Sequence, residues 1–288
     1  MTPSRESVGA IVRELARRLR AAGRAEPEAL AEWAVATALG IGRAALRAGH
    51  LPTAPTPDQL AQVENVAARL LAGEPFAYAV GWTEFCGRRF RVDRRVLIPR
   101  PETEELAELT LRIAIPEHAA LDVWDVGTGS GVLAITIALE RPLVRVTATD
   151  VMDDAIAVAR SNAEQHGVSD RIRWRVADLL GPFDEQVADV IVSNPPYVPA
   201  AEIEHLDPQV RDFEPRAALD GGGDGLAVIR RLIPAAARAL RPGGWLCLEI
   251  GETQGCALRG LLEQSGFADV QVHRDLAGRE RFAIARRS

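Results

Sequence analysis

The sequence predicts an α/β protein with a mostly parallel, Rossmann-like sheet, an antiparallel C-terminal strand and a small N-terminal helical domain. From residue 101 onward, short apolar runs alternate with helical patterns, and this alternation is typical of a parallel sheet covered by helices. Before residue 75, the apolar residues recur only at helical spacing. With 288 residues, 47% of them hydrophobic, the chain is long enough to build two domains with a sizeable core.

The first region, residues 1–78, is predicted to be a helical domain. Val8, Val12 and Leu15 follow helical spacing, and further runs of this kind lie within residues 30–38 and 60–70. The region contains no cluster of histidines and cysteines and no pair of acids suited to catalysis. Its residues therefore predict a scaffold or a docking surface rather than a chemical site.

Residues 79–100 are predicted to form a β-hairpin connector. Apolar residues fall among polar ones over residues 84–98, which is the pattern of two short strands. The same stretch is rich in arginine, and either a solvated hairpin face or a binding patch explains this. The net charge of −6 and the pI of about 5.5 argue against a surface that neutralises a phosphate backbone, so no direct nucleic-acid binding is expected.

Residues 101–288 are predicted to form the α/β domain. A helix is expected over residues 103–113, and Asp153 and Asp154 favour the start of a later helix because acids complement its dipole. The last two strands are spaced as a hairpin, which supplies the antiparallel strand. The strands are expected near residues 121–126, 144–149, 171–176, 187–193, 244–250, 268–273 and 280–286, and the other helices near 131–140, 153–166, 225–240 and 254–265.

A glycine-rich turn, Gly-Thr-Gly-Ser-Gly at residues 127–131, follows the first predicted strand. Glycines let the backbone approach a ligand closely and adopt positive φ without steric cost. The next strand ends on Asp150, about twenty residues further on, where a carboxylate suits binding to ribose hydroxyls. The third glycine of the NAD fingerprint would fall at Val132, so the pattern favours a nucleoside without phosphates, S-adenosyl-L-methionine. An N-cap role for Asp150 is the alternative.

A second motif, Asn-Pro-Pro-Tyr at residues 194–197, ends another predicted strand. Proline fixes its own φ and has no N–H, so this corner is stiff and its carbonyls meet no competing donors. A planar –NH₂ group has two donors, and we expect the Asn194 side-chain oxygen and the Pro195 carbonyl to accept both. Tyr197 is expected to lay its ring beside the substrate or a sulfonium cation. The alternative is a strand-ending turn in which Asn194 is only a capping residue.

These motifs are predicted to meet at one edge of the sheet. Gly127, Asp150, Asp178 and Asn194 all follow strands, and ligands of such sheets bind at the carboxyl ends of the strands. The segment 194–225 has little periodicity, and loops of this length are usually functional or disordered. We expect a solvated lid there. Its single histidine among irregularly spaced acids is weak evidence for a metal, so no metal site is expected.

With these motifs in place, the chain closely resembles the release-factor glutamine N5-methyltransferases, essentially from end to end. The resemblance also rests on residues 97–104 (Leu-Ile-Pro-Arg-Pro-Glu-Thr-Glu), 213–219 (Phe-Glu-Pro-x-x-Ala-Leu) and 248–251 (Leu-Glu-Ile-Gly). It implies transfer of a methyl group from S-adenosyl-L-methionine, leaving S-adenosyl-L-homocysteine, to the side-chain amide nitrogen of the Gly-Gly-Gln glutamine in peptide-chain release factors. It also implies that the helical domain grips the release factor.

The resemblance further assigns roles to individual residues. Asp150 binds the ribose, and Asp178 with its successor borders the adenine; some members carry Trp at position 179, where an apolar wall of Leu179 and Val151 is expected here. The predicted cofactor-binding residues are Gly127, Thr128, Gly129, Ser130, Gly131, Asp150, Val151, Asp178, Leu179 and Asn194. The predicted catalytic residues are Asn194, Pro195 and Tyr197. The predicted substrate-binding residues are Asn194, Pro195, Pro196 and Tyr197.

Other functions stay open from the residues alone. Enzymes that modify adenine or guanine share Asn-Pro-Pro-Tyr, so an amino-methyltransferase acting on nucleic acid is the main alternative. The acidic pI and the absence of a target-recognition insert disfavour it. A cofactor-binding module without catalysis, or an NAD-linked oxidoreductase, is a further alternative.

The composition also bears on the compartment. Three cysteines are too few and too scattered for a disulfide framework. No apolar run approaches the roughly 18 residues of a membrane span, and no signal-peptide core follows the N-terminus. These features predict a soluble cytoplasmic enzyme without a membrane partner.

Overall fold

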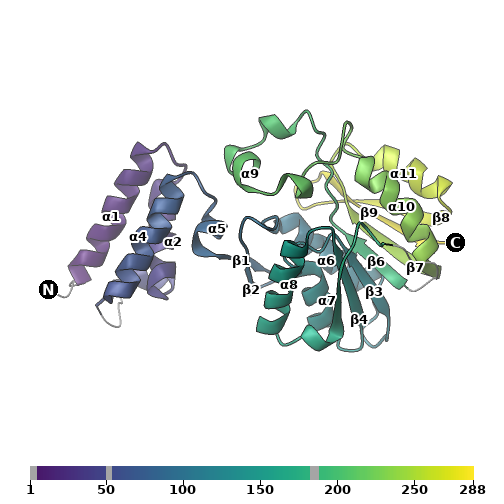
Figure 1. Ribbon diagram of the computed structural model, residues 1–288, viewed down its shortest axis with the longest axis horizontal. Coiled ribbons are helices and arrows are strands. Elements are labelled where there is room, and N and C mark those ends of the chain that lie inside the picture. The colour runs from purple at the N-terminus through teal and green to yellow at the C-terminus, as the bar shows by residue number, and fades with distance from the viewer. Residues whose placement is uncertain (1–4, 50–53, 182–187) are drawn as a thin grey trace. The chain divides into compact units, whose positions relative to one another are not determined.

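The computed structural model describes residues 5–49, 54–181 and 188–288 (Figure 1). The chain divides into two compact units: one contains the residues up to Trp82 together with Asp207–Phe213, and the other contains Thr83–Leu206 and Glu214–Ser288. The domain boundaries predicted at residues 78 and 100 stay a prediction. Residue 187, where a strand was expected to begin, lies outside the described residues.

The first unit is a bundle of short helices, as the helical spacing predicts. Its buried core includes Leu15, Leu19, Val35 and Leu70, which share one cluster. Thr56 opens one helix with a capping box, because its hydroxyl accepts from the Gln59 N–H and the Gln59 side chain accepts in return. The helices are α1 (Arg5–Ala21), α2 (Pro27–Leu39), α3 (Arg43–Arg47), α4 (Pro57–Leu71) and α5 (Phe76–Val80), together with α9 (Pro208–Phe213).

The connector forms a hairpin that is shorter than expected. Strands β1 (Trp82–Phe85) and β2 (Arg88–Arg91) pair as a two-stranded sheet. Cys86 and Gly87 join them at φ values of 48° and 70°, the positive pair that a tight type I′ turn requires. The predicted extension to residue 98 is wrong, because Val92 and Val96 are buried without belonging to a strand. Their apolar spacing reflects burial rather than pairing.

The second unit contains a seven-stranded sheet in the order β5-β4-β3-β6-β7-β9-β8. Its neighbouring strands pair in parallel except β9, which is antiparallel to both β7 and β8. The predicted fold class is therefore confirmed. The strands are β3 (Asp122–Val126), β4 (Arg145–Asp150), β5 (Ile172–Val176), β6 (Ala188–Ser193), β7 (Leu240–Glu249), β8 (Phe267–Arg274) and β9 (Glu280–Arg287).

Helices cover both faces of this sheet (Figure 1). Successive strand residues alternate between the two cores: Val123 packs in one cluster and Trp124 in the other, because side chains of a strand point to opposite faces. The first face is covered by α6 (Pro101–Ile113), α7 (Val132–Glu140) and α8 (Asp153–Gln165), and the second by α10 (Ala227–Ala239) and α11 (Gly255–Gln264).

Strand order places a ligand-binding crevice beside β3. The chain leaves β3 for β4 on one side and later adds β6 on the other, and doubly wound sheets bind ligands where the order switches in this way. The predicted loop 194–225 contains short helical turns at Ile203–His205 and Arg216–Ala218, and a bridge between Val198 and Asp220 closes it on itself. No helix in the described part of the chain has the length and apolar character of a membrane span.

Candidate active site

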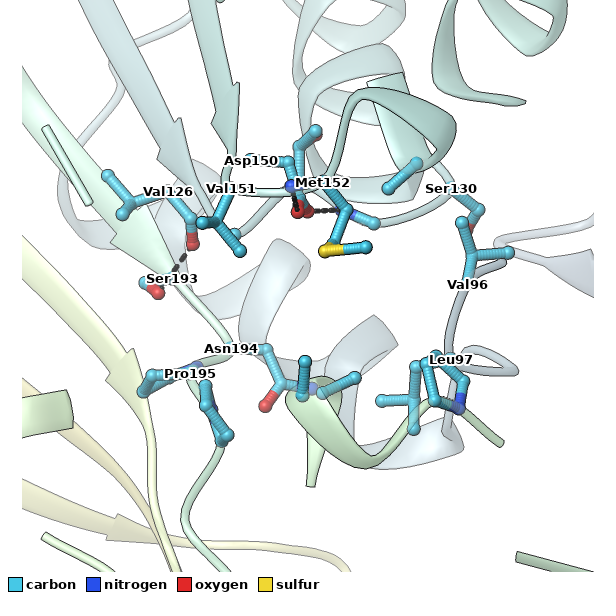
Figure 2. A pocket seen from close by; sticks show the side chains of 18 of the residues that line it. Val96, Leu97, Val126, Ser130, Asp150, Val151, Met152, Ser193, Asn194 and Pro195 are labelled. Atoms are coloured by element: carbon cyan, nitrogen blue, oxygen red, sulfur yellow. Dashed lines mark hydrogen bonds between the residues drawn. The ribbon is translucent and has the colours of Figure 1, made fainter. Parts of the chain in front are cut away.

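A cavity opens at the carboxyl edge of the sheet, and every residue that lines it belongs to the second unit. Val126, Thr149 and Ser193 are register partners on β3, β4 and β6. The residues that follow them are therefore brought together across three strands. In Figure 2, Asn194 and Pro195 lie on one side of this cavity and Asp150, Val151 and Met152 on the other. The cavity is also lined by Gly127, Thr128, Gly129, Ser130, Asp178, Leu179 and Pro196.

The glycine-rich turn forms the base of the cavity beside the Asn-Pro-Pro-Tyr corner. Gly127, Gly129 and Gly131 all have positive φ, as the motif predicts. A Cβ on Gly127 would lie 4.0 Å from the main-chain oxygen of Asn194, so the two motifs adjoin. A Cβ on Gly131 would lie 3.0 Å from the Ala159 Cβ, which leaves no free room for a side chain.

The buried side chain of Asp125 stabilises this turn through hydrogen bonds. Its Oδ2 accepts from the Thr128 hydroxyl at 2.6 Å and from the Ala134 N–H at 3.1 Å. Burial raises the pKa of the Asp125 carboxyl to about 7, although the two hydrogen bonds oppose this shift. The carboxyl thereby ties the end of β3 to the first turn of α7.

Asp150 ends β4 on the opposite side of the cavity. Its carboxylate accepts from the Gly129 N–H at 2.9 Å and from the Met152 N–H at 3.0 Å. Burial raises the pKa of Asp150, and these backbone donors oppose the shift. The N-cap interpretation is wrong, because the N-cap of α8 is Met152. Asp150 instead joins the glycine turn to the start of the helix and lines the cavity.

Leu179 forms part of an apolar wall. It adopts φ = 54°, a conformation that leucine rarely takes, and its carbonyl accepts from the Thr149 hydroxyl at 2.8 Å. The neighbouring Asp178 forms an ion pair with Arg231, and both side chains are more than half exposed. Val151 and Leu97 are also part of the apolar lining. The wall thus consists of aliphatic side chains, with leucine at position 179, where the resemblance indicates tryptophan in some members of the family.

The Asn194 side chain is held by one end only. Its Nδ2 donates to the Thr103 Oγ1 at 3.0 Å. Within residues 5–49, 54–181 and 188–288, no donor reaches the Asn194 Oδ1 or the Pro195 carbonyl. The Ser193 hydroxyl just before it donates to the Val126 carbonyl at 2.6 Å and fixes the end of β6 against β3 (Figure 2). Two acceptors are thus left at the corner.

The Tyr197 side chain makes its contacts with Glu249 and Arg281, outside the lining of the cavity. Its hydroxyl donates to the Glu249 Oε1 at 3.1 Å, and the guanidinium of Arg281 lies 5.9 Å from its ring centroid. Burial and then the Glu249 charge raise the pKa of the Tyr197 phenol. Tyr197 is not among the described residues that line the cavity, whereas Pro196 is.

The long loop after Tyr197 is fixed to the connector by a buried carboxylate. Glu214, 6% exposed, accepts from Arg100 Nη2 at 2.6 Å and from the Ile98 N–H at 3.4 Å. The residues directly after Glu214 line the cavity, as does Leu97 of the connector. The pair therefore joins two segments of the cavity wall.

Sequence reasoning named no role for several residues of this site. Thr103 begins the predicted helix 103–113, Glu249 lies in the stretch 248–251, and Asp125 lies in the strand before the glycines, but no motif assigns a function to any of the three. Thr103 lies 91 residues from Asn194 and 146 from Glu249 along the chain, so no local spacing could have related them. Met152 and the connector residues Arg95 and Val96 also line the cavity without a sequence signal.

Two family models match parts of this chain. The family model described as PrmC N-terminal domain matches residues 10–81, and the one described as Methyltransferase small domain matches residues 107–207. A release factor glutamine methyltransferase of Geobacter sulfurreducens is 42% identical over 87% of this chain and 86% of its own length. One from Cereibacter sphaeroides is 45% identical over 93% and 94%.

A solved methyltransferase structure from Pyrococcus furiosus shares the fold. It matches with a TM-score of 0.54 and 21% identity, and the match covers 78% of this chain and 99% of that one. The sequence identities and coverage of the curated relatives are those of one protein family. The chain belongs to the release factor glutamine methyltransferases.

Proposed function

We propose that this enzyme transfers a methyl group from S-adenosyl-L-methionine to the side-chain amide nitrogen of the glutamine in the Gly-Gly-Gln motif of peptide-chain release factors. The observation that carries the proposal is the corner at Asn194: one side-chain oxygen and the Pro195 carbonyl are left as acceptors, and the Asn194 NH₂ donates to Thr103. A carboxamide nitrogen carries two donors and matches two acceptors. The names of the curated relatives support the same substrate class.

The residues that line the cavity fit the methyl donor. Gly127 and Gly129, both at positive φ, leave room for close approach, Asp150 offers carboxylate oxygens suited to ribose hydroxyls, and Leu179 and Val151 give an apolar wall for a base. We propose the ten residues predicted from sequence, from Gly127 to Asn194, as the cofactor-binding set. When bound, this group supplies a methyl carbon made electrophilic by a positively charged sulfur.

The protein supplies position rather than a strong base. A carboxamide nitrogen is a poor nucleophile because its lone pair is delocalised into the carbonyl, as in a peptide bond. Asn194 Oδ1 and the Pro195 carbonyl accept the two N–H groups, which turns the face of the nitrogen into the cavity. Orientation of this kind lowers the barrier by removing the entropy of alignment. An acceptor such as a carbonyl or water then takes the excess proton from the alkylated amide.

Asn in this position avoids burying an unpaired charge beside the donor. We propose Pro196 as a wall of the glutamine site and Tyr197 as a support for the corner through its hydroxyl. We also propose that the helices of the first unit dock the release factor, that the segment 194–225 acts as a lid, and that the enzyme works in the cytoplasm.

The direct test is mass spectrometry of a release factor after incubation with the enzyme and S-adenosyl-L-methionine. The expected product carries one added methyl on the glutamine of Gly-Gly-Gln, and a release factor with that glutamine changed to Ala gains none. Parallel incubations use DNA and RNA with labelled donor. Label in nucleic acid but not in the release factor contradicts the proposal. S-adenosyl-L-methionine, but not NADH, is expected to raise the melting temperature.

A further inference from the structure

We propose that Thr103 and Glu249 are positioning residues that fix the amide of Asn194 with its oxygen toward the substrate and its nitrogen away from it. This inference rests on the proposed function, because the orientation matters only if Asn194 Oδ1 accepts from a carboxamide. If the Asn194 amide were flipped, its NH₂ would face the NH₂ of the substrate, and neither group could accept a hydrogen bond from the other. The three side chains come from α6, from the end of β6 and from the end of β7.

The contacts form an unbroken chain from Asn194 to Tyr197. Asn194 Nδ2 lies 3.0 Å from Thr103 Oγ1, and Thr103 Oγ1 lies 2.7 Å from Glu249 Oε2. The other carboxylate oxygen, Glu249 Oε1, lies 3.1 Å from the Tyr197 hydroxyl. Thr103 is 3% exposed and Glu249 is 1% exposed, so bulk water is excluded from the centre of the chain.

The direction of each hydrogen bond follows from the chemistry of the terminal group. An ionised carboxylate only accepts, so Thr103 must donate its single hydroxyl hydrogen to Glu249 and Tyr197 must do the same. The Thr103 oxygen can then only accept from its other neighbour. The group of Asn194 that faces Thr103 must therefore be the NH₂, which leaves Oδ1 for the substrate.

The direction of these hydrogen bonds depends on whether Glu249 is ionised, and its surroundings influence this. Burial raises the pKa of Glu249 to about 7, while the hydroxyls of Thr103 and Tyr197 and the charge of Arg281 oppose the rise, and Glu102 on α6 adds to it. Arg281 is itself held by Asp275 at 3.5 Å. A proton on Glu249 converts one of its two oxygens into a donor. Thr103 is then free to donate to Asn194, and the amide loses its fixed direction.

A consequence is discrimination between glutamine and glutamate. The fixed corner offers two acceptors, which suit a carboxamide and repel a carboxylate. When the amide orientation is mixed, Asn194 offers its NH₂ part of the time, and a carboxylate becomes an acceptable ligand. Loss of this orientation therefore lowers kcat and also narrows the preference for glutamine over glutamate.

The test uses the full enzyme with Thr103→Val, which keeps the shape of the side chain and removes both hydrogen bonds. We expect kcat to fall by about 10- to 100-fold, the cost of modest misalignment, with little change in KM for the donor. Thr103→Ser should restore most of the rate. Thr110→Val is the matched control, because Thr110 is a fully buried threonine on the same helix, and within the described part of the chain no hydrogen bond joins it to Asn194.

A second readout uses a release factor whose Gly-Gly-Gln glutamine is replaced by glutamate as a competitive inhibitor. Thr103→Val should bind this inhibitor at least several-fold more tightly relative to the glutamine substrate than the wild type does. An unchanged ratio together with an unchanged kcat overturns the inference. Because the wild type is assayed alongside, a wild type that fails to methylate refutes the proposed function instead.

Glu249→Gln keeps the inference testable if Thr103→Val does not fold. In the wild type, kcat should rise with pH as Glu249 loses its proton through about 7. In Glu249→Gln this step should be absent, and the rate above pH 7 should lie about tenfold below the wild type, since the two hydroxyls bond to different oxygens of Glu249 and glutamine has an NH₂ donor in place of one of them. A wild-type profile retained in the variant overturns the inference.

Discussion

The two sides of the cavity are built by different means. The side at β3 and β4 is a local structure: three glycines within five residues, followed by one carboxylate that accepts two backbone N–H groups. The side at β6 and β7 is a relay of side chains, in which Asn194 depends on Thr103 and Glu249, each more than fifty residues away along the chain. The first side is shaped by backbone conformation, the second by side-chain hydrogen bonds.

Because the two sides are built differently, substitutions on them should impair two different properties of the enzyme. Damage to the glycine side should weaken binding of the donor, because the backbone and Asp150 shape that part of the cavity. Damage to the asparagine side should slow the chemical step, because it changes how the substrate nitrogen is aligned. Substitutions on the two sides should therefore alter different kinetic constants.

The largest effect is expected for Asn194→Ala. Loss of the side-chain acceptor leaves the amide nitrogen unaligned, and kcat should fall by about 10³-fold, as when one preorganised group is removed from an active site. The Kd for S-adenosyl-L-methionine should change only slightly. Stopped assays with a release factor measure kcat, and calorimetry measures the Kd.

The Asn194→Ala result separates the proposed role from a structural one. Thermal melting of the variant should stay close to that of the wild type, since Asn194 is only partly buried. A variant with wild-type kcat would show that Asn194 merely ends the strand, and the difference between the two sides would disappear.

An effect of intermediate size is expected from the ionisation of Glu249, which should make the free energy of unfolding depend on pH. The pKa of Glu249 is about 7 in the folded chain, above the ordinary 4.5, so the folded state holds this proton more tightly than the unfolded state. The free energy of unfolding should therefore fall as the pH rises from about 4.5 to about 7, by about 3 kcal/mol for this group. Chemical denaturation at pH 5 and pH 8 measures the fall.

Glu249→Gln should reduce that fall, because the variant has no proton to lose there. The Asp125 carboxyl also has a pKa of about 7 and is still present, so a residual slope over the same pH range is expected from it. An identical slope in the wild type and in Glu249→Gln would mean that Glu249 is ionised in both states, and the asparagine side would lack its titrating group.

The same difference explains how much the sequence revealed. The positions of most strands and helices follow from alternation and periodicity, and the glycine turn and Asp150 follow from spacing, because all of these are local properties. The hairpin end at Arg91 was missed because burial of Val92 and Val96 imitates strand alternation. Thr103 and Glu249 could not be placed, because their meeting with Asn194 depends on how α6 and β7 pack in the finished fold.

The smallest effect is expected for Asp150→Ala, on the glycine side. The variant loses the proposed ribose contact and frees the N–H groups of Gly129 and Met152. Two or so lost hydrogen bonds of this kind correspond to roughly a 10- to 50-fold weaker Kd for S-adenosyl-L-methionine. At saturating donor, kcat should recover to near the wild-type value, since the Asn194 corner is untouched. Asp153→Ala, an exposed acid three residues later, is the matched control and should bind normally. If Asp150→Ala instead lowered kcat at saturating donor, the two sides of the cavity would act as one cooperative unit, and the division between backbone-built binding and side-chain-built alignment would be wrong.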